Sequence, residues 1–216
     1  MLQLWAHYLP RFLHGTVVTL ELTVTGLLLA LVLGAVTAAL RMAPNRLLRN
    51  VAAVYIEVVR AIPVIVLLFI AYFSLAEMGI VLPAFPCVVL TLGVFYATLY
   101  GEYFRGGVES VPRGQREAAI ALGLPRSVVL RRIILPQALN AILPPATNSA
   151  ADLLKDTSLV VTIGGVAEIM YQAYGAAATT FQPMTMYVLA GLFYFPIYYV
   201  LSKVLRGWEV RHAQRY

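Results

Sequence analysis

Runs of roughly 20 predominantly apolar residues, enough to cross a bilayer as a helix, constrain this chain more than any other feature. They occupy 15–40, 51–73, 84–105, 138–160 and 184–205. Of the 216 residues, 61% are hydrophobic and 12% charged, about half the charged share of a soluble domain. The sequence therefore predicts an all-α integral membrane protein with about five transmembrane helices.

The fourth run is the most polar of the five, because it contains Pro144, Pro145, Asn148 and Asp152. Such a helix crosses a membrane only where its polar groups face protein or water. The stretch 161–183 is too polar and too rich in glycine and alanine to span. It predicts a short helix and a loop at the outer surface.

Charged residues also interrupt the second run. Glu57 and Arg60 are three residues apart, so they share one helix face and can pair. A charge inside a bilayer usually faces the interior of a helix bundle. We expect a buried structural pair here, with substrate contact as the alternative. Pro63 predicts a kink in the same helix, and Glu102 with Arg105 predicts a second structural pair.

Most of the basic residues lie between the apolar runs on one predicted side of the membrane. They follow the first run (Arg41, Arg46, Arg49), the third (Arg105, Arg113, Arg116, Arg126, Arg131, Arg132) and the fifth (Lys203, Arg206, Arg211, Arg215). By the positive-inside rule, the N-terminus is outside and the C-terminus is cytoplasmic. Short arginine clusters between membrane helices also argue against nucleic acid as the partner.

Three regions follow from this arrangement. Residues 1–14, with Trp5 and Tyr8, predict an extracytoplasmic interfacial segment. Residues 15–206 form the transmembrane domain, and 207–216 a cytoplasmic tail. Cys87 is the single cysteine, so an internal disulfide is excluded and no metal site is predicted.

The pattern of residues 114–138 predicts a polar helix-turn-helix. Gln115 and Glu117 open a short helix of small and apolar residues, Gly123 can take the positive φ that ends it, and Pro125 suits the next first turn. A loop between membrane spans folds this specifically where a partner docks. The candidate docking residues are Gly114, Gln115, Glu117, Ala118, Ala119 and Gly123.

An ordered set of motifs resembles one family. Glu117-Ala118-Ala119 with Gly123 and Leu135-Pro136-Gln137-Ala138 is similar to the EAA loop of ABC importer permeases, here at about 109–137. The other matching segments are Gly15-Thr16, Thr19-Leu20, Arg60-Ala61-Ile62-Pro63, Glu102, Arg105-Gly106 and Leu154-Lys155-Asp156-Thr157-Ser158-Leu159. The set resembles the polar amino acid branch, the permeases for histidine, glutamine, glutamate, arginine and cystine.

This resemblance implies an ABC type-1 permease bundle in the bacterial inner membrane. The permease would work with a second copy or a close homologue, two cytoplasmic ATPase subunits and an extracytoplasmic solute-binding protein that delivers a polar amino acid. ATP and magnesium would be used by the ATPases. The chain itself has no phosphate-binding loop, since Gly164-Gly165 is followed by Val166 rather than a lysine motif, so we expect no enzymatic activity.

Two other classes stay open. A secondary transporter or channel would need an ion site near the midplane, often on broken helices. Pro63 and Pro144-Pro145 could break helices, and Glu57 could carry a proton. It would leave the folded polar loop unexplained. A membrane scaffold without transport is the third class.

The candidate pathway residues are Asn148, Lys155, Asp156 and Glu168. Asn148 could line the pathway or bond another helix. Lys155 or Asp156 could face the cavity of a dimer, or belong to a network at the end of the helix or to a contact with a binding protein. Glu168 is a candidate contact for the binding protein or part of an outer gate.

Overall fold

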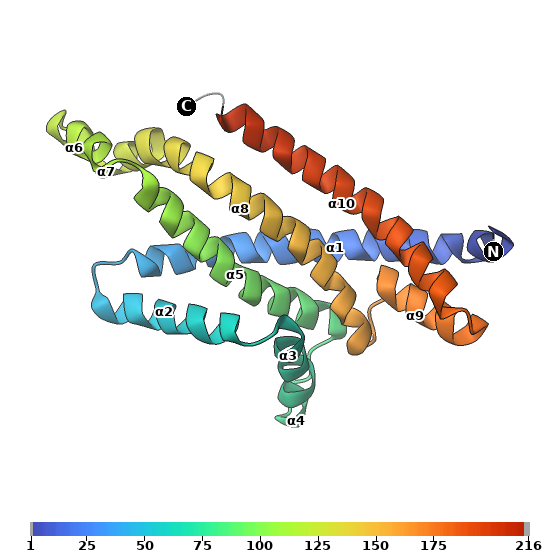
Figure 1. Ribbon diagram of the computed structural model, residues 1–216. Helices are drawn as coiled ribbons and strands as arrows, with labels where there is room; N and C mark the ends of the chain where they lie inside the picture. Colours follow the sequence, from blue (N-terminus) through green and yellow to red (C-terminus); the bar gives the residue numbers. More distant parts are fainter. Residues whose placement is uncertain (1, 214–216) are drawn as a thin grey trace.

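The computed structural model describes residues 2–213, and this part of the chain contains helices, turns and loops but no strand (Figure 1). The α-helices are α1 (Leu2–Arg41), α2 (Arg46–Ala61), α3 (Val64–Phe69), α4 (Leu75–Glu77), α5 (Ala84–Ser110), α6 (Arg113–Ala121), α7 (Arg126–Val128), α8 (Leu135–Asp156), α9 (Ile169–Thr180) and α10 (Pro183–Ala213). Three short segments connect some of these helices: the π-helical segments η1 (Ile70–Ser74) and η2 (Val129–Ile134), and the 3-10 segment η3 (Thr157–Thr162). The all-α membrane fold is confirmed.

Three helices of the described chain are long and apolar enough to cross a membrane. They are α1 over Leu4–Arg41, α5 over Ala84–Ser110 and α10 over Pro183–Trp208. The helix α8, the fourth expected span, has 22 residues but is not among the helices that reach this apolarity. It packs between α5 and α10, so protein covers much of its surface.

The second expected span is broken. α2 and the following segment Val64–Glu77 are long and apolar enough to cross a membrane only when taken together, and they meet at an angle of 101°. Ile62 has extended backbone angles (φ −97°, ψ 128°) and Pro63 precedes the first turn of α3. Proline removes a backbone donor and clashes with the preceding helical turn, so the kink predicted at Pro63 is confirmed and is a sharp bend (Figure 1).

α1 and α5 pack at very short range because glycine stands where they meet. A Cβ atom built on Gly34 would lie 2.7 Å from the Cβ of Tyr100, and one on Gly101 would lie 2.9 Å from Cγ2 of Thr37. Small residues at such contacts let helix backbones approach closely in membranes, where packing replaces the hydrophobic drive. The glycines therefore set the α1–α5 distance.

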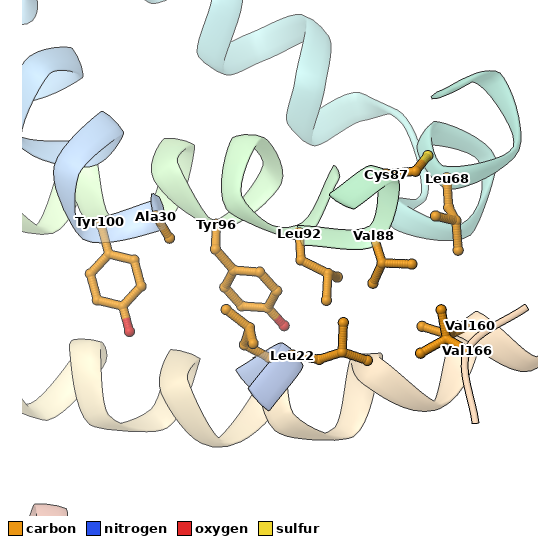
Figure 2. Close-up of a cluster of buried hydrophobic side chains, with 11 residues drawn as sticks. Leu22, Ala30, Leu68, Cys87, Val88, Leu92, Tyr96, Tyr100, Val160 and Val166 are labelled. Carbon is orange, nitrogen blue, oxygen red and sulfur yellow. The ribbon is translucent and has the colours of Figure 1, made fainter. Parts of the chain in front are cut away.

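The largest buried cluster lies between α5, α1 and α8 (Figure 2). Tyr96 and Tyr100 point from α5 toward α8, and the Tyr100 hydroxyl donates a hydrogen bond to the Ala146 carbonyl oxygen (2.9 Å). That carbonyl lies just after Pro144 and Pro145, inside α8. Buried tyrosines usually find a partner for the hydroxyl, and here they fasten the proline-containing helix to the core.

The N-terminal segment does not form a separate unit. α1 begins at Leu2 and continues through the first expected span without a break. Tyr8 and Phe12 are buried against α9 and α10, at the end of the molecule opposite α6 (Figure 1). Its location at an outer interface stays a prediction. The expected C-terminal tail is likewise part of α10 up to Ala213, and residues 214–216 lie outside the described residues.

Candidate functional site

The polar loop folds around a helix stop at Gly123. This residue has φ +70°, as the sequence predicted. The Gly123 N–H donates to the Ile120 carbonyl oxygen (2.9 Å) and the Leu124 N–H donates to the Ala119 carbonyl oxygen (3.1 Å). These two bonds form a Schellman motif, which ends a helix and satisfies its last carbonyl groups. Pro125 then precedes the first turn of α7.

α6 presents almost its whole surface to solvent. Gly114, Gln115, Glu117 and Ala118 are exposed, and so are the apolar side chains of Ile120 (57%) and Leu122 (79%). Exposed apolar side chains on a polar helix are typical of a docking surface. The candidate docking residues therefore stand together at one end of the molecule (Figure 1).

Ala119 is the exception among these residues. It is 3% exposed and packs with Val129 and Ile134 in a small cluster that holds α6 against η2. The small side chain thus serves the fold of the loop itself. A partner would meet the neighbouring Ala118 and Ile120 instead.

An ion-pair network lies at the base of this loop. The guanidinium of Arg105 contacts Glu102 (2.6 Å) and Glu109 (2.5 Å), while Arg41 at the end of α1 contacts Glu102 (3.2 Å). The structural pair predicted for Glu102 and Arg105 is therefore present, and Arg41 extends it to a second helix. A network that joins α1 to α5 fixes the helix end from which α6 departs.

A groove of about 900 Å³ opens beside this network, between the end of α1, the start of α2 and α6. Its charged lining consists of Arg41, Arg49, Glu109, Arg113, Arg116 and Glu117. Arginine dominates this lining, so the groove is suited to acidic groups.

The C-terminal half of α8, away from the α6 loop, carries a polar face. Asn148, Asp152 and Lys155 are all exposed, and their spacing of four and three residues places them on one side of the helix. Lys155 Nζ lies 2.6 Å from Asp152 Oδ1 and 5.6 Å from the centre of the Tyr198 ring on α10. A helix with this face needs water or protein beside it in a membrane.

Asp156 lies apart from that face. Its Oδ2 accepts a hydrogen bond from the Tyr96 hydroxyl of α5 (2.8 Å), and it is only partly exposed. The structure therefore separates the two neighbours: Lys155 faces outward beside Asn148, and Asp156 ties α8 to α5. Asp152 is the residue that sequence reasoning did not select, although its spacing from Asn148 and Lys155 was a usable signal.

Glu168 is completely buried (0% exposed) just before α9. Its carboxylate accepts hydrogen bonds from the backbone N–H groups of Met170 (2.8 Å) and Tyr171 (2.6 Å) and from the Tyr194 hydroxyl (2.6 Å). Burial raises the pKa of Glu168 to about 7. The prediction of a direct contact with a binding protein is wrong for this protomer, because the side chain has no solvent access.

Close packing encloses Glu168. A Cβ atom on Gly15 of α1 would lie 3.0 Å from the Ile169 nitrogen and 3.1 Å from the Glu168 carbonyl carbon. The Ile169 N–H donates to the Thr19 hydroxyl oxygen of α1 (3.3 Å). The buried carboxylate therefore joins α9 to α10, and the backbone of Glu168 and Ile169 packs on α1. A role in an outer gate stays a prediction.

The expected buried pair of Glu57 and Arg60 is not formed. Both side chains are exposed on α2, and no salt bridge within the described chain joins them. The residues of α2 that turn inward are Ala52 and Ile56. The prediction was wrong for the single protomer because α2 lies at the edge of the bundle, where α1 and α5 are its main neighbours within the described chain.

Residues 30–208 match the model of the family described as binding-protein-dependent transport system inner membrane component. The chain belongs to this family. Among curated relatives, this chain is 36% identical to the glutamine transport system permease protein GlnP of Escherichia coli, with 94% of this chain and 93% of that protein covered. It is 32% identical to the arginine transport system permease protein ArtQ of Bacillus subtilis, covering 93% and 92%.

Solved structures agree with this membership. This chain superimposes on a chain from the crystal structure of an amino acid ABC transporter with histidines, with a TM-score of 0.88 and 32% identity, and 95% of this chain and 96% of that chain are covered. A chain of the inward-facing MetNI methionine ABC transporter gives a TM-score of 0.70 at 19% identity, covering 92% and 96%, and shows that the fold is shared. The described residues hold no cluster of side chains suited to a metal ion.

Proposed function

We propose that this protein is the permease subunit of an ABC importer for a polar amino acid. It acts as a dimer, of two copies or of one copy with a close homologue, and receives its substrate from a solute-binding protein. Two ATPase subunits dock on α6 from the cytoplasm and use ATP and magnesium. The observation that carries this proposal is the exposed α6 helix, with its Schellman stop, in a chain whose relatives are amino acid permeases.

The geometry supports movement through α6. Exposed Ile120 and Leu122 would enter a groove of the ATPase, and Ala119 with Val129 would transmit the displacement to η2 and α8. The network of Arg41, Glu102 and Arg105 would carry it to α1 and α5. Closure of the ATPases around ATP would thus rock one bundle against the other, which is a bistable element driven from outside the chain.

The polar face of α8 supports a pathway for a polar solute. Asn148, Asp152 and Lys155 present an amide, a carboxylate and an ammonium group on one side of the helix. An amino acid carries the matching carboxylate and ammonium groups. Asp156 acts behind this face by holding α8 on Tyr96.

The orientation belongs to the same proposal. With α6 in the cytoplasm, the N-terminus lies outside and the C-terminus inside. A reporter active only in the cytoplasm, fused after Arg49 or Gly123, should be active, whereas fusions after Glu77 or Ala177 should be silent. Activity after Ala177 would contradict the assignment of α8 as a span.

The deciding experiment is reconstitution of the permease in vesicles with its neighbouring ATPase and binding protein. We expect uptake of a labelled polar amino acid only with ATP inside and binding protein outside. Uptake without the ATPase and driven by an ion gradient would instead show a secondary transporter. The matched pair Leu122→Asp and Leu9→Asp tests the docking surface: both side chains are exposed, but only the first should abolish association with the ATPase.

A further inference from the structure

α2 has three distinct faces. Ala52 and Ile56 are buried, and the hydroxyl of the neighbouring Tyr55 donates to the Val94 carbonyl oxygen of α5 (2.7 Å). A second face carries exposed apolar side chains: Leu47, Val51, Val54 and Val58. The third face carries the polar side chains at helical spacing, with a small residue among them: Arg46, Arg49, Asn50, Ala53, Glu57 and Arg60. The valine face suits lipid tails, whereas the polar face does not.

The polar face extends deep into the membrane. At the helical rise, Glu57 lies about 16 Å along α2 from Arg46, near the middle of a hydrocarbon core of about 30 Å. Ionisable side chains at such depth face protein or water rather than lipid. The sharp bend at Pro63 follows within two turns, and a helix break at membrane depth also needs protein or water beside it. Something must therefore cover this face.

The protomer itself does not cover it. α2 packs on α1 and α5 along its other side, and no salt bridge reaches Glu57 or Arg60 in the described chain. The charged groups of α5 and α8 already have partners, because Glu102 contacts Arg41 and Arg105 and Lys155 contacts Asp152. The cover therefore comes from outside the protomer.

The face is complementary to itself. At membrane depth, beyond the small side chain of Ala53, it offers one acid, Glu57, and one base, Arg60, three residues apart; Arg46 and Arg49 lie at the start of the helix. In a two-fold symmetric interface, each residue of one copy meets the reciprocal residue of the other. A single acid–base pair on one face thus forms two ion pairs when two copies meet, and the alanine lets the helices approach.

We infer that the polar face of α2 is a contact between two copies of this chain, in which Glu57 of each copy pairs with Arg60 of the other. The inference rests on the proposed function, which requires two permease subunits. In this inference, Glu57 and Arg60 hold two subunits together, which differs from a pair within one helix and from a contact with substrate.

The test uses two copies with different affinity tags, co-expressed and purified in detergent. At the depth of the pair, E57R gives a copy with two basic groups, and R60E gives a copy with two acidic groups. Each variant expressed with itself should lose at least about tenfold of the co-purified partner, because like charges then meet in a poorly solvated interface. Mixing E57R with R60E should restore both ion pairs and recover the co-purification of wild type.

Only a contact between copies predicts that recovery. A pair within one helix is destroyed in both variants and stays destroyed in the mixture, and a substrate contact is likewise not restored. Failure of the mixture to recover, or absence of co-purification for the wild type, would overturn the inference. The conservative variants E57D and R60K serve as controls and should keep most of the association.

Crosslinking tests the geometry without charge changes. In a Cys87→Ala background, Ala53→Cys on the polar face should crosslink between copies, whereas Val54→Cys on the valine face should not. The reverse pattern would overturn the inference. Uptake by wild-type vesicles, measured in parallel, separates the two proposals: transport without recovery in the E57R and R60E mixture refutes the α2 contact and leaves the importer intact.

Discussion

Substitution of Glu168 by glutamine should remove a pH dependence of stability. The Glu168 carboxylate is fully buried and lies among Met170, Tyr171 and Tyr194, with no basic side chain among its hydrogen-bond partners. Burial in such a site favours the neutral acid. Glutamine keeps a carbonyl oxygen for the cap of α9 but has no proton to lose.

The magnitude follows from the shift in pKa. The pKa of Glu168 rises from 4.5 to about 7 in the folded protein. Each unit corresponds to about 1.4 kcal/mol, so the folded state gains up to about 3 kcal/mol from the protonated carboxyl group. Because the folded protein holds the proton more tightly than the unfolded chain, this stabilisation is complete below pH 4.5 and is lost as the pH rises through about 7.

The assay is thermal unfolding in detergent at a series of pH values from about 5 to about 8, spanning the usual and the raised pKa. The wild type should lose about 5–10 °C of Tm relative to Glu168→Gln across this range. Glu77→Gln, at an exposed carboxylate at the end of α4, is the matched control and should keep the wild-type slope. Equal slopes for the wild type and Glu168→Gln would refute the reasoning, because the buried carboxyl group would then not titrate differently on folding.

Three other substitutions test separate contacts. Gly123→Val should abolish uptake and ATPase association while the protein still inserts in the membrane, because a β-branched residue is strained at φ +70°. Gly123→Asn is the control and should keep uptake and association, because asparagine tolerates a positive φ. Normal uptake by the valine variant would contradict the docking role of α6. Tyr96→Phe should lower the free energy of unfolding by about 1–3 kcal/mol, because Asp156 loses its hydrogen-bond donor. An unchanged Tm would show that the Tyr96–Asp156 hydrogen bond does not stabilise the fold. Gly34→Val should lower the free energy of unfolding by about 2 kcal/mol or more through overpacking, since its Cβ would lie 2.7 Å from a Cβ of α5. Gly106→Ala, where the added Cβ would meet open space, should leave the Tm unchanged in the same thermal unfolding assay.

The sequence by itself determined the features that depend on local chemistry. Long apolar runs have no stable alternative to membrane helices, which fixed the all-α class. The stop at Gly123 and the bend at Pro63 were also predictable, because positive φ and the missing proline donor act within one or two turns. The i, i+3 spacing of Glu102 and Arg105 predicted their ion pair for the same reason.

Whether two charged side chains form an ion pair was decided by residues that are distant in the sequence. The spacing of Glu57 and Arg60 is the same as that of Glu102 and Arg105. Within the described residues, however, no salt bridge reaches the first two, which are exposed, while the others pair. The difference is that Arg41 and Glu109 surround the α5 pair, whereas α2 lies at the edge of the bundle. Spacing permits an ion pair, but only the packing of other helices decides whether it forms.

Glu168 and Ala119 show the same limit. A glutamate beside a glycine-rich loop, and an alanine on a polar helix, are exposed residues by local pattern. α1 and α10 close over Glu168, and η2 covers Ala119. Burial is a property of the assembled chain, since it depends on which surfaces meet, so the pKa of Glu168 and the role of Ala119 were decided by tertiary structure alone.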